Sequence, residues 1–335
     1  MTEPHVLAES PEILARRFRE LFDRISASIG RRVVGQKAAV ASVFSALLAG
    51  GHVLLEGVPG LGKTLLVRTL AESLSLAYGR IQFTPDLMPA DVTGTHLVVE
   101  EPDGRRSFRF QRGPVFAQIV LADEINRATP KTQSALLEAM EERAVTSGGR
   151  RYELDEPFCV LATQNPIEME GTYPLPEAQL DRFLFKVKIP YPSLEDLKEI
   201  GRRTTSAEPA PTGPVAGAEE ILALRRLVRS VAVAPHIEDY VARLVVATNP
   251  GPRGVLDEVR RFVRCGASPR GLQALLLGGK VRALLAGRFH LSAEDARAVA
   301  LEALRHRLVL SFEGEAEGVD PDGIVRAVVE SVKGP

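Results

Sequence analysis

The sequence predicts an α/β fold in which helices sandwich a parallel sheet with two hairpin inserts, followed by a small all-α domain. Three observations support this prediction. Strand-like and helical patterns alternate between residues 52 and 189, as in parallel sheets covered by helices. The first strand runs directly into residues 57–64, which match G-x-x-x-x-G-K-[ST], the P-loop pattern, at every fixed position. From Glu219 onward only helical periodicity remains.

Length and composition are typical of a soluble globular protein. The chain has 335 residues, 45% of them hydrophobic and 25% charged, enough for one large domain or two of ordinary size. No apolar run reaches the roughly 18 residues of a transmembrane helix, and the N-terminus lacks a signal-peptide pattern. Cys159 and Cys265 lie far apart and form neither a disulfide framework nor a metal-ligand spacing. We therefore expect a cytoplasmic protein with no membrane span.

Two helices are expected before the sheet, at residues 11–29 and 36–49, where apolar positions recur at helical spacing. Two hairpin inserts, at residues 95–110 and 145–154, interrupt the alternation that follows, with turns at 102–104 and 148–149. The expected strands of the parallel sheet lie at residues 52–56, 77–83, 118–122, 158–163 and 183–189.

The composition changes after Tyr191 and Pro192, where we place a domain boundary. A helix at residues 194–203 leads into a linker rich in proline and alanine at residues 207–214. Helices follow, and Ser292-Ala293-Glu294-Asp295 opens the last clear one with a capping box. The expected parts are an N-terminal helix, a P-loop α/β domain, a connecting helix with linker, and an α-helical domain, at residues 1–30, 31–192, 193–218 and 219–330.

Residues 57–64 predict a phosphate site, because a strand precedes them and a helix pattern at residues 65–76 follows. The glycines let backbone N–H groups approach phosphate oxygens, and the helix adds its positive end. Lys63 supplies a charge for the β- and γ-phosphates, and the Thr64 hydroxyl is a ligand for Mg²⁺. No N-K-x-D guanine motif occurs, which disfavours GTP as the nucleotide.

Residues 119–124 form an apolar run that ends in two acids, Asp123 and Glu124. A strand buried in the sheet delivers these acids to its carboxyl end, where open α/β sheets bind ligands. There Asp123 is placed to hold Mg²⁺ through water, and Glu124 to take a proton from a water that attacks the γ-phosphate. Together with the P-loop upstream, this motif predicts ATP hydrolysis.

Three further candidates are weak when taken alone. Asn165 follows the strand at 158–163 and could orient the attacking water, although asparagine before proline is also an ordinary turn. Arg182, at the start of the last strand, and Arg270, in the helical domain, could each contribute about 10³–10⁵ in rate by stabilising the charge of phosphoryl transfer. Most arginines are simply solvated, so both interpretations stay open for these two.

Five motifs in order resemble the MoxR group of AAA+ ATPases, a helix-2-insert clade. The resemblance covers roughly residues 20–310, and it is specific because the motifs occur jointly. They are Asp123-Glu124-Ile125-Asn126-Arg127-Ala128, residues 131–142, Ala162-Thr163-Gln164-Asn165-Pro166, residues 175–183 and Gly266-Ala267-Ser268-Pro269-Arg270. The chain departs from the family modestly, with Thr248-Asn249 where threonine-arginine is expected and Gly271 where alanine is common.

The resemblance implies roles for individual residues. Asn165 resembles sensor 1, and Arg270 resembles sensor 2, which reaches from the helical lid to the nucleotide of its own subunit. Arg182 resembles the arginine finger, which acts on the neighbouring subunit's nucleotide, and Arg127 is a second candidate at that interface. The expected catalytic residues are Glu124, Lys63, Asn165, Arg182 and Arg270, and the expected metal ligands are Thr64 and Asp123. The expected nucleotide-binding residues are Val34, Gly35, Gln36, Val58, Pro59, Gly60, Leu61, Gly62, Lys63, Thr64 and Leu65.

The same resemblance implies a chaperone-like enzyme that binds ATP and Mg²⁺, forms a hexameric ring, works with a von Willebrand factor A domain protein and acts on a client protein. The hairpins resemble the inserts that line or flank the pore in related rings. Alternatives are a nucleic-acid translocase, a metal-chelatase motor subunit and a nucleotide-sensing adaptor without turnover. The net charge of −1 and the few hairpin aromatics argue against the first, and the intact Glu124 argues against the last.

Overall fold

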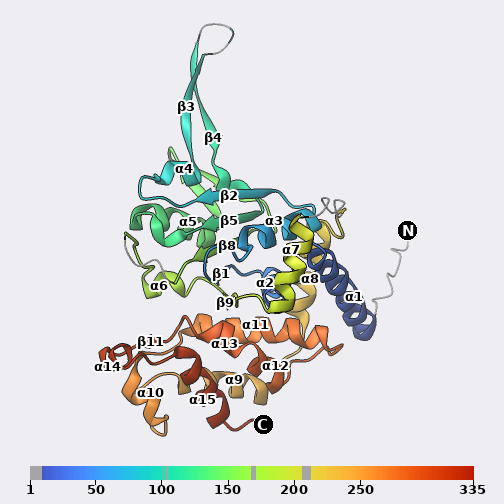
Figure 1. The fold of residues 1–335 in the computed structure, drawn as a ribbon, viewed down its shortest axis with the longest axis vertical. Coiled ribbons are helices and arrows are strands. Elements are labelled where there is room, and N and C mark those ends of the chain that lie inside the picture. The colour runs from blue at the N-terminus through green and yellow to red at the C-terminus, as the bar shows by residue number, and fades with distance from the viewer. Residues whose placement is uncertain (1–9, 101, 103–104, 167–170, 206–212) are drawn as a thin grey trace, which may run out of the picture.

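The computed structural model describes residues 10–100, 102, 105–166, 171–205 and 213–335. An α/β part lies at the centre, a long hairpin projects from one end, and the C-terminal helices pack at the other end (Figure 1). Three predicted features fall partly outside the described residues: the start of the N-terminal segment, the turn of the first hairpin and most of the linker at 207–214. The helices of the α/β part are α1 Pro11–Gly30, α2 Lys37–Ala49, α3 Lys63–Ser73, α4 Pro89–Thr93, η1 Pro114–Phe116, η2 Ile125–Arg127, α5 Pro130–Glu142 and α6 Glu177–Leu180.

Five parallel strands form the central sheet in the order β2-β5-β8-β1-β9. Each of them confirms one predicted strand. Because all five run in one direction, their carboxyl ends meet at a single edge of the sheet. Their bounds are β1 Val53–Glu56, β2 Tyr78–Gln82, β5 Ile119–Asp123, β8 Cys159–Gln164 and β9 Phe185–Lys188.

Helices cover both faces of this sheet, because successive side chains of a strand point to opposite faces. In β1, Val53 belongs to the core that α2 and α3 share, whereas Leu54 belongs to the core on the α5 side. Leu136, Leu137 and Met140 of α5 are 0%, 0% and 3% exposed, which confirms that they are core residues. The inner strands β1, β5 and β8 are therefore apolar along most of their length, as strands buried on both faces must be, whereas the edge strands β2 and β9 also carry polar and charged side chains.

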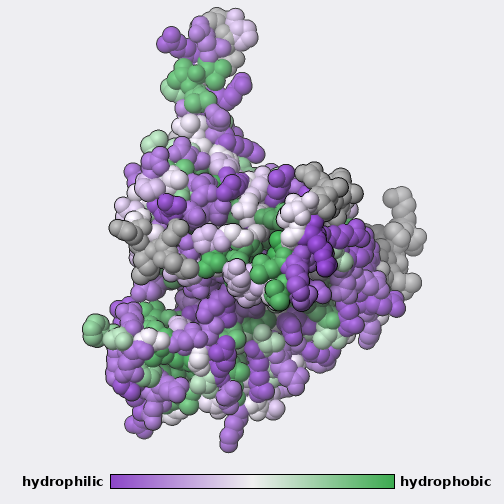
Figure 2. Space-filling model, viewed as in Figure 1, coloured by the Kyte–Doolittle hydropathy of each residue, from purple (hydrophilic) through white to green (hydrophobic). Residues whose placement is uncertain are grey.

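Both predicted hairpins are present, and an aromatic stack joins them. The first consists of β3 (Gly94–Glu100) and β4 (Arg106–Arg112), and the second of β6 (Ala144–Ser147) and β7 (Arg150–Glu153). Phe110 of the first stacks on Tyr152 of the second, with ring centroids 4.3 Å apart. Further out on the first hairpin, an apolar patch is visible in Figure 2, where Leu97, Val98 and Phe108 are 44%, 57% and 77% exposed.

The C-terminal part is helical with one exception. The prediction that only helices follow Glu219 is wrong where β10 (Val263–Cys265) pairs antiparallel with β11 (Val309–Leu310), since strands this short show no periodicity. The capping box at Ser292 is confirmed, although three more helices follow the one it opens. The helices are α7 Leu194–Thr205, α8 Ala218–Ser230, α9 Pro235–Ala247, α10 Asp257–Phe262, α11 Pro269–Leu285, α12 Ala293–Ala298, α13 Ala300–Leu304, α14 Phe312–Ala316 and α15 Pro321–Ser331.

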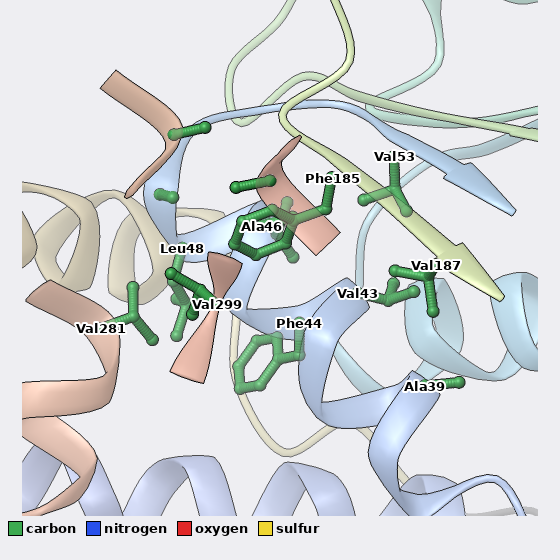
Figure 3. Packing of buried hydrophobic residues seen from close by; sticks show 14 of the residues in the cluster. Ala39, Val43, Phe44, Ala46, Leu48, Val53, Phe185, Val187, Val281 and Val299 are labelled. Carbon is green, nitrogen blue, oxygen red and sulfur yellow. The ribbon is translucent and has the colours of Figure 1, made fainter. Parts of the chain in front are cut away.

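The C-terminal helices share a core with the sheet. Figure 3 shows Phe185 and Val187 of β9 with side chains of α2 and with Val281 and Val299 of the C-terminal part. Gly278 of α11 permits this packing, because a Cβ atom there would lie 2.6 Å from the Phe185 ring. The last strand of the sheet and the C-terminal helices are therefore packed as one unit.

Candidate functional site

The P-loop connects the carboxyl end of β1 to α3. Gly60 and Gly62 have φ values of 82° and 75°, in the left-handed region that favours glycine. These turns let α3 begin at Lys63, so that the first N–H groups of the helix, which have no acceptor within the helix itself, lie at the loop. The Lys63 ammonium group donates to the carbonyl oxygens of Gly57 and, at 3.2 Å, of Val58. Lys63 is thus held at the loop that the sequence predicts to bind phosphates.

Strand β8 brings the acidic motif and Asn165 beside the P-loop. It pairs with β1 on one side and with β5 on the other, so it lies between the two strands that carry the main motifs. The N–H group of Gly57 donates to the carbonyl oxygen of Gln164 at 3.3 Å, and the adjacent Asn165 is buried, 6% exposed. The predicted neighbourhood of Asn165 and the acidic strand is therefore confirmed.

Thr163 of β8 connects the two acids of the motif. Its hydroxyl donates to Asp123 Oδ1 at 2.7 Å and accepts from the Glu124 N–H group at 2.7 Å. Glu124 has a φ of 56°, an uncommon conformation for a residue with a Cβ atom. The strand thus ends in a tight turn, and Thr163 fixes the carboxylate of Asp123 relative to the backbone of Glu124.

Three further polar side chains contact the two acids. The sequence predicted no role for two of them, and the family resemblance placed the third, Arg127, at the interface with a neighbouring subunit. Arg80 of β2 pairs with Asp123 Oδ2 at 2.7 Å, and Gln82 of the same strand donates to Glu124 Oε2 at 3.1 Å. Arg127, in η2, pairs with the same Glu124 oxygen at 3.0 Å. Only the strand order, which places β2 beside β5, could have identified Arg80 and Gln82.

A pocket of about 220 Å³ lies beside the P-loop. The buried Gln36 reaches it, donating through Nε2 to the Leu61 carbonyl oxygen, while its Oε1 atom has no partner among the described residues. An unpaired buried acceptor of this kind suits a ligand that carries an N–H donor. Six of the lining residues are predicted nucleotide-binding positions: Val34, Gln36, Gly60, Leu61, Gly62 and Leu65. The sequence did not predict the others, which are Arg32, Val33 and Pro192 together with Ile200, Arg203 and Thr204 of α7.

The predicted Mg²⁺ ligands fit the chemistry of that ion. Magnesium prefers oxygen ligands and is commonly held by one or two side chains together with phosphates and water. Asp123, 9% exposed, points both oxygens to donors, and each oxygen keeps a second lone pair for a metal-bound water. Thr64 follows Lys63 in the first turn of α3. These residues would therefore hold the ion between the acidic motif and the P-loop.

Arg182 lies at the opposite edge of the sheet from the P-loop. It precedes β9, which pairs in parallel with β1, whereas the P-loop follows β1. Both strands have four residues, so the two edges are separated by roughly 13 Å at about 3.3 Å per residue. There Arg182 pairs with Glu141 at 2.7 Å and donates to the Leu137 carbonyl oxygen at 2.6 Å.

Arg270 lies with Arg182 and not with the P-loop. Its guanidinium pairs with Glu141 at 2.6 Å and with Asp181 at 3.8 Å, and it does not line the pocket beside the P-loop. These contacts therefore differ from the expectation that Arg270 reaches the nucleotide of its own subunit. The physical reason is that Ser268, at the start of α11, donates to Asp181 Oδ2 at 2.7 Å, which docks this end of the helix beside Arg182.

None of the helices in the described part of the chain has the length and apolarity that crossing a bilayer requires.

A family model described as "ATPase family associated with various cellular activities (AAA)" matches residues 52–185, and one described as "AAA lid domain" matches residues 258–328. A solved structure of a Cytophaga hutchinsonii protein inferred to be an ATPase superposes with a TM-score of 0.89 at 40% identity, covering 96% of this chain and 97% of that one.

Several curated relatives span most of the chain. It is 44% identical to the uncharacterized protein YeaC of Bacillus subtilis over 92% of both chains. It is 42% identical to Chaperone MoxR1 of Mycobacterium tuberculosis, over 93% of this chain and 82% of that one, and 36% identical to protein MoxR of Methylorubrum extorquens, over 95% and 96%. With its P-loop, its acidic motif and its helical lid in this arrangement, the chain belongs to the MoxR family of AAA ATPases.

Proposed function

We propose that this protein hydrolyses ATP in a hexameric ring and uses the energy to remodel or mature a client protein. The observation that carries the proposal is the separation of the P-loop from Arg182 and Arg270 by the length of the sheet's strands. Within one chain, Arg182 and Arg270 both lie on Glu141, away from the phosphate site. A ring supplies them, because each subunit presents its arginine edge to the nucleotide edge of the next.

The residues of one chain provide the rest of the chemistry. Glu124 takes the proton from the attacking water, and Asn165 orients that water. Lys63 neutralises phosphate charge, while Thr64 and Asp123 hold Mg²⁺, which when bound neutralises charge on the phosphate oxygens. Thr163 keeps the Asp123 carboxylate in place through its 2.7 Å hydrogen bond.

The pocket beside the P-loop is proposed to hold the adenine. Val34 and Gln36 line it from the segment before α2, and Ile200 and Thr204 line it from α7. Gly35 is required between them, because its φ is 74° and a Cβ atom there would lie 2.5 Å from the Asp196 carboxyl carbon. The remaining P-loop residues contribute backbone N–H groups to the phosphates.

The hexamer and the von Willebrand factor A domain partner rest on the resemblance to the MoxR group. The chaperone-like role has the further support that one relative is named Chaperone MoxR1. Translocation along nucleic acid is less well supported, because base stacking needs exposed aromatic rings. Phe110 and Tyr152 stack on each other, which leaves Phe108, 77% exposed, as the solvent-facing aromatic ring of the described hairpin residues.

ATPase activity measured against protein concentration, with particle mass measured on the same samples, tests the ring. We expect the specific activity to rise as a species of several subunits forms with ATP and Mg²⁺. A monomer with full specific activity would contradict the proposal. A titration with single-stranded DNA at two salt concentrations tests the alternative, since translocases bind DNA in a salt-dependent manner.

A further inference from the structure

A buried arginine of the lid binds the chain on both sides of Arg182. Arg307, whose side chain is 2% exposed, donates to the Asp181 carboxylate at 2.8 Å and to the Asp181 carbonyl oxygen at 3.1 Å. It also donates to the carbonyl oxygens of Phe183 at 2.8 Å and Leu184 at 3.1 Å. Arg182 therefore lies within a segment in which one guanidinium from the lid holds three backbone carbonyl oxygens.

Packing of the lid against β9 does not by itself require a buried, hydrogen-bonded arginine. A buried charge is costly unless it is paired and hydrogen-bonded, and apolar residues can replace such a group with little loss of stability. Burial lowers the pKa of Arg307 to about 10, and the neighbouring Asp181 opposes that change, so the group stays charged at neutral pH. Its planar set of five N–H donors suits several acceptors at fixed angles. What Arg307 adds is a defined backbone conformation for residues 181–184.

Asp181 also connects Arg307 to the backbone of Arg270. Its Oδ1 atom accepts from Arg307, and its Oδ2 atom accepts from Ser268 at 2.7 Å. Ser268 also caps α11 by accepting from the Arg270 N–H group at 3.0 Å. The backbone N–H group of Arg270 is thus linked through Ser268 to the carboxylate of Asp181, the residue directly before Arg182, and Arg307 holds that carboxylate in place.

We propose that Arg307 is a positioning residue that orients Arg182 toward the nucleotide of the neighbouring subunit. Through Asp181, it orients Arg270 toward the same nucleotide. The inference rests on the proposed function, in which these two arginines act across the subunit interface. It adds that the lid of one subunit controls hydrolysis in the next, because the lid carries Arg307. A lid that shifted relative to β9 would move the arginine pair with it.

The test uses Arg307→Met, which keeps the volume of the stem and removes every donor. Arg305→Met is the matched control, because Arg305 is also a lid arginine whose side chain is only 10% exposed, but it pairs with Asp322 and donates to the Lys186 carbonyl oxygen. Each variant is assayed for ATP affinity, for turnover and for thermal stability. Each is then mixed in equal amounts with Lys63→Ala, whose subunits lack ATP binding but supply an intact arginine edge. Arg182→Ala mixed with Lys63→Ala is the reference.

We expect Arg307→Met to bind ATP with an affinity within about twofold of the parent and to lose roughly 10²-fold in turnover, as misplacement by about 1 Å can do. Mixing with Lys63→Ala should restore its activity to the level of the reference mixture, and Arg305→Met should keep its turnover. Wild-type turnover by Arg307→Met would overturn the inference. So would a loss that Lys63→Ala does not restore while the reference is restored, since the defect would then lie in the subunit's own site.

If the reference mixture itself stays inactive, the proposed function fails, and the inference fails with it for that separate reason. If Arg307→Met does not fold, Arg307→Lys replaces it, because lysine keeps the charge but offers a single nitrogen in place of the planar fork. We expect an intermediate loss of turnover for Arg307→Lys, restored in the same mixture. Full turnover by that variant would overturn the inference.

Discussion

Arg182 and Arg270 donate to different oxygens of one carboxylate, that of Glu141, at 2.7 and 2.6 Å. Arg182 belongs to the α/β part and Arg270 to the lid, so Glu141 joins two arginines that come from separate parts of the chain. The carboxylate offsets the repulsion between the two cations. Both groups therefore occupy one place at the edge of the sheet opposite the P-loop.

Glu141→Gln tests whether this pairing matters for turnover. An amide has one acceptor oxygen, so it can hold one guanidinium in place but not both. We expect turnover to fall about tenfold through poorer orientation of the arginines, whereas stability should change by no more than about 1 kcal/mol, because the pairs are partly exposed. Steady-state ATPase assays and urea unfolding measure the two effects. Glu142→Gln, whose carboxylate pairs with Arg151 at 3.5 Å, is the control, and equal turnover in both variants would contradict the prediction.

Glu124→Gln should bind ATP and fail to hydrolyse it. The amide keeps the shape of the side chain but cannot accept the proton, which should lower turnover by about 10²–10⁴. Thermal stabilisation by ATP with Mg²⁺ should persist, because ligand binding stabilises the folded state whether or not hydrolysis follows. Glu330→Gln, at an exposed position of α15, controls for the change of charge. Normal turnover by Glu124→Gln would remove this residue from the mechanism.

Arg127→Ala distinguishes action within one subunit from action between subunits. Arg127 pairs with Glu124 of its own chain at 3.0 Å, at the same edge of the sheet as the P-loop. We expect its loss to reduce turnover about tenfold by releasing the Glu124 carboxylate from its place, and we expect no recovery in mixtures with Lys63→Ala. Recovery in that mixture would assign Arg127 to the site of the neighbouring subunit instead.

The parts of the site that follow from local patterns could be predicted from the sequence. The P-loop and the acidic motif each follow a short buried strand, and such strands reveal themselves by apolar runs. Asn165 could be proposed in the same way, because it directly follows the apolar run of β8.

The remaining residues depend on long-range packing. Arg80 and Gln82 enter the site because β2 lies beside β5, and nothing in their own segment encodes that order. Ile200 reaches the pocket because α7 folds over the P-loop. Arg270 reaches Glu141 because Ser268 docks on Asp181. Sequence periodicity determines the type of an element, but not which distant side chains its ends will contact.

His52 should make the protein less stable as the pH falls from 7 to 5. Its Nδ1 accepts from the Val160 N–H group at 2.9 Å, and its Nε2 lies 3.3 Å from the Met140 carbonyl oxygen. Burial lowers the pKa of His52 to about 3, whereas the unfolded chain titrates near 6.5. Between these values the unfolded state binds the additional proton, so the free energy of unfolding decreases with falling pH, by about 2 kcal/mol from pH 7 to pH 5 for this residue.

His52→Gln checks that assignment, because glutamine keeps a donor and an acceptor but does not titrate. We expect it to be less stable at pH 7, and to lose about 2 kcal/mol less than the parent between pH 7 and pH 5. Urea unfolding at both pH values gives the comparison, in which other titrating groups cancel. Equal losses for the two proteins would show that His52 does not titrate on unfolding.

The central claim is that one subunit's P-loop works with the next subunit's arginines, and mixing two inactive variants tests it most directly. Lys63→Ala lacks the phosphate-binding cation, and Arg182→Ala lacks the arginine for its neighbour. In an equal mixture, about a quarter of the interfaces of a ring combine an intact P-loop with an intact Arg182. The account predicts that each variant alone is inactive and that the mixture hydrolyses ATP. A mixture that assembles into rings and stays inactive would contradict it.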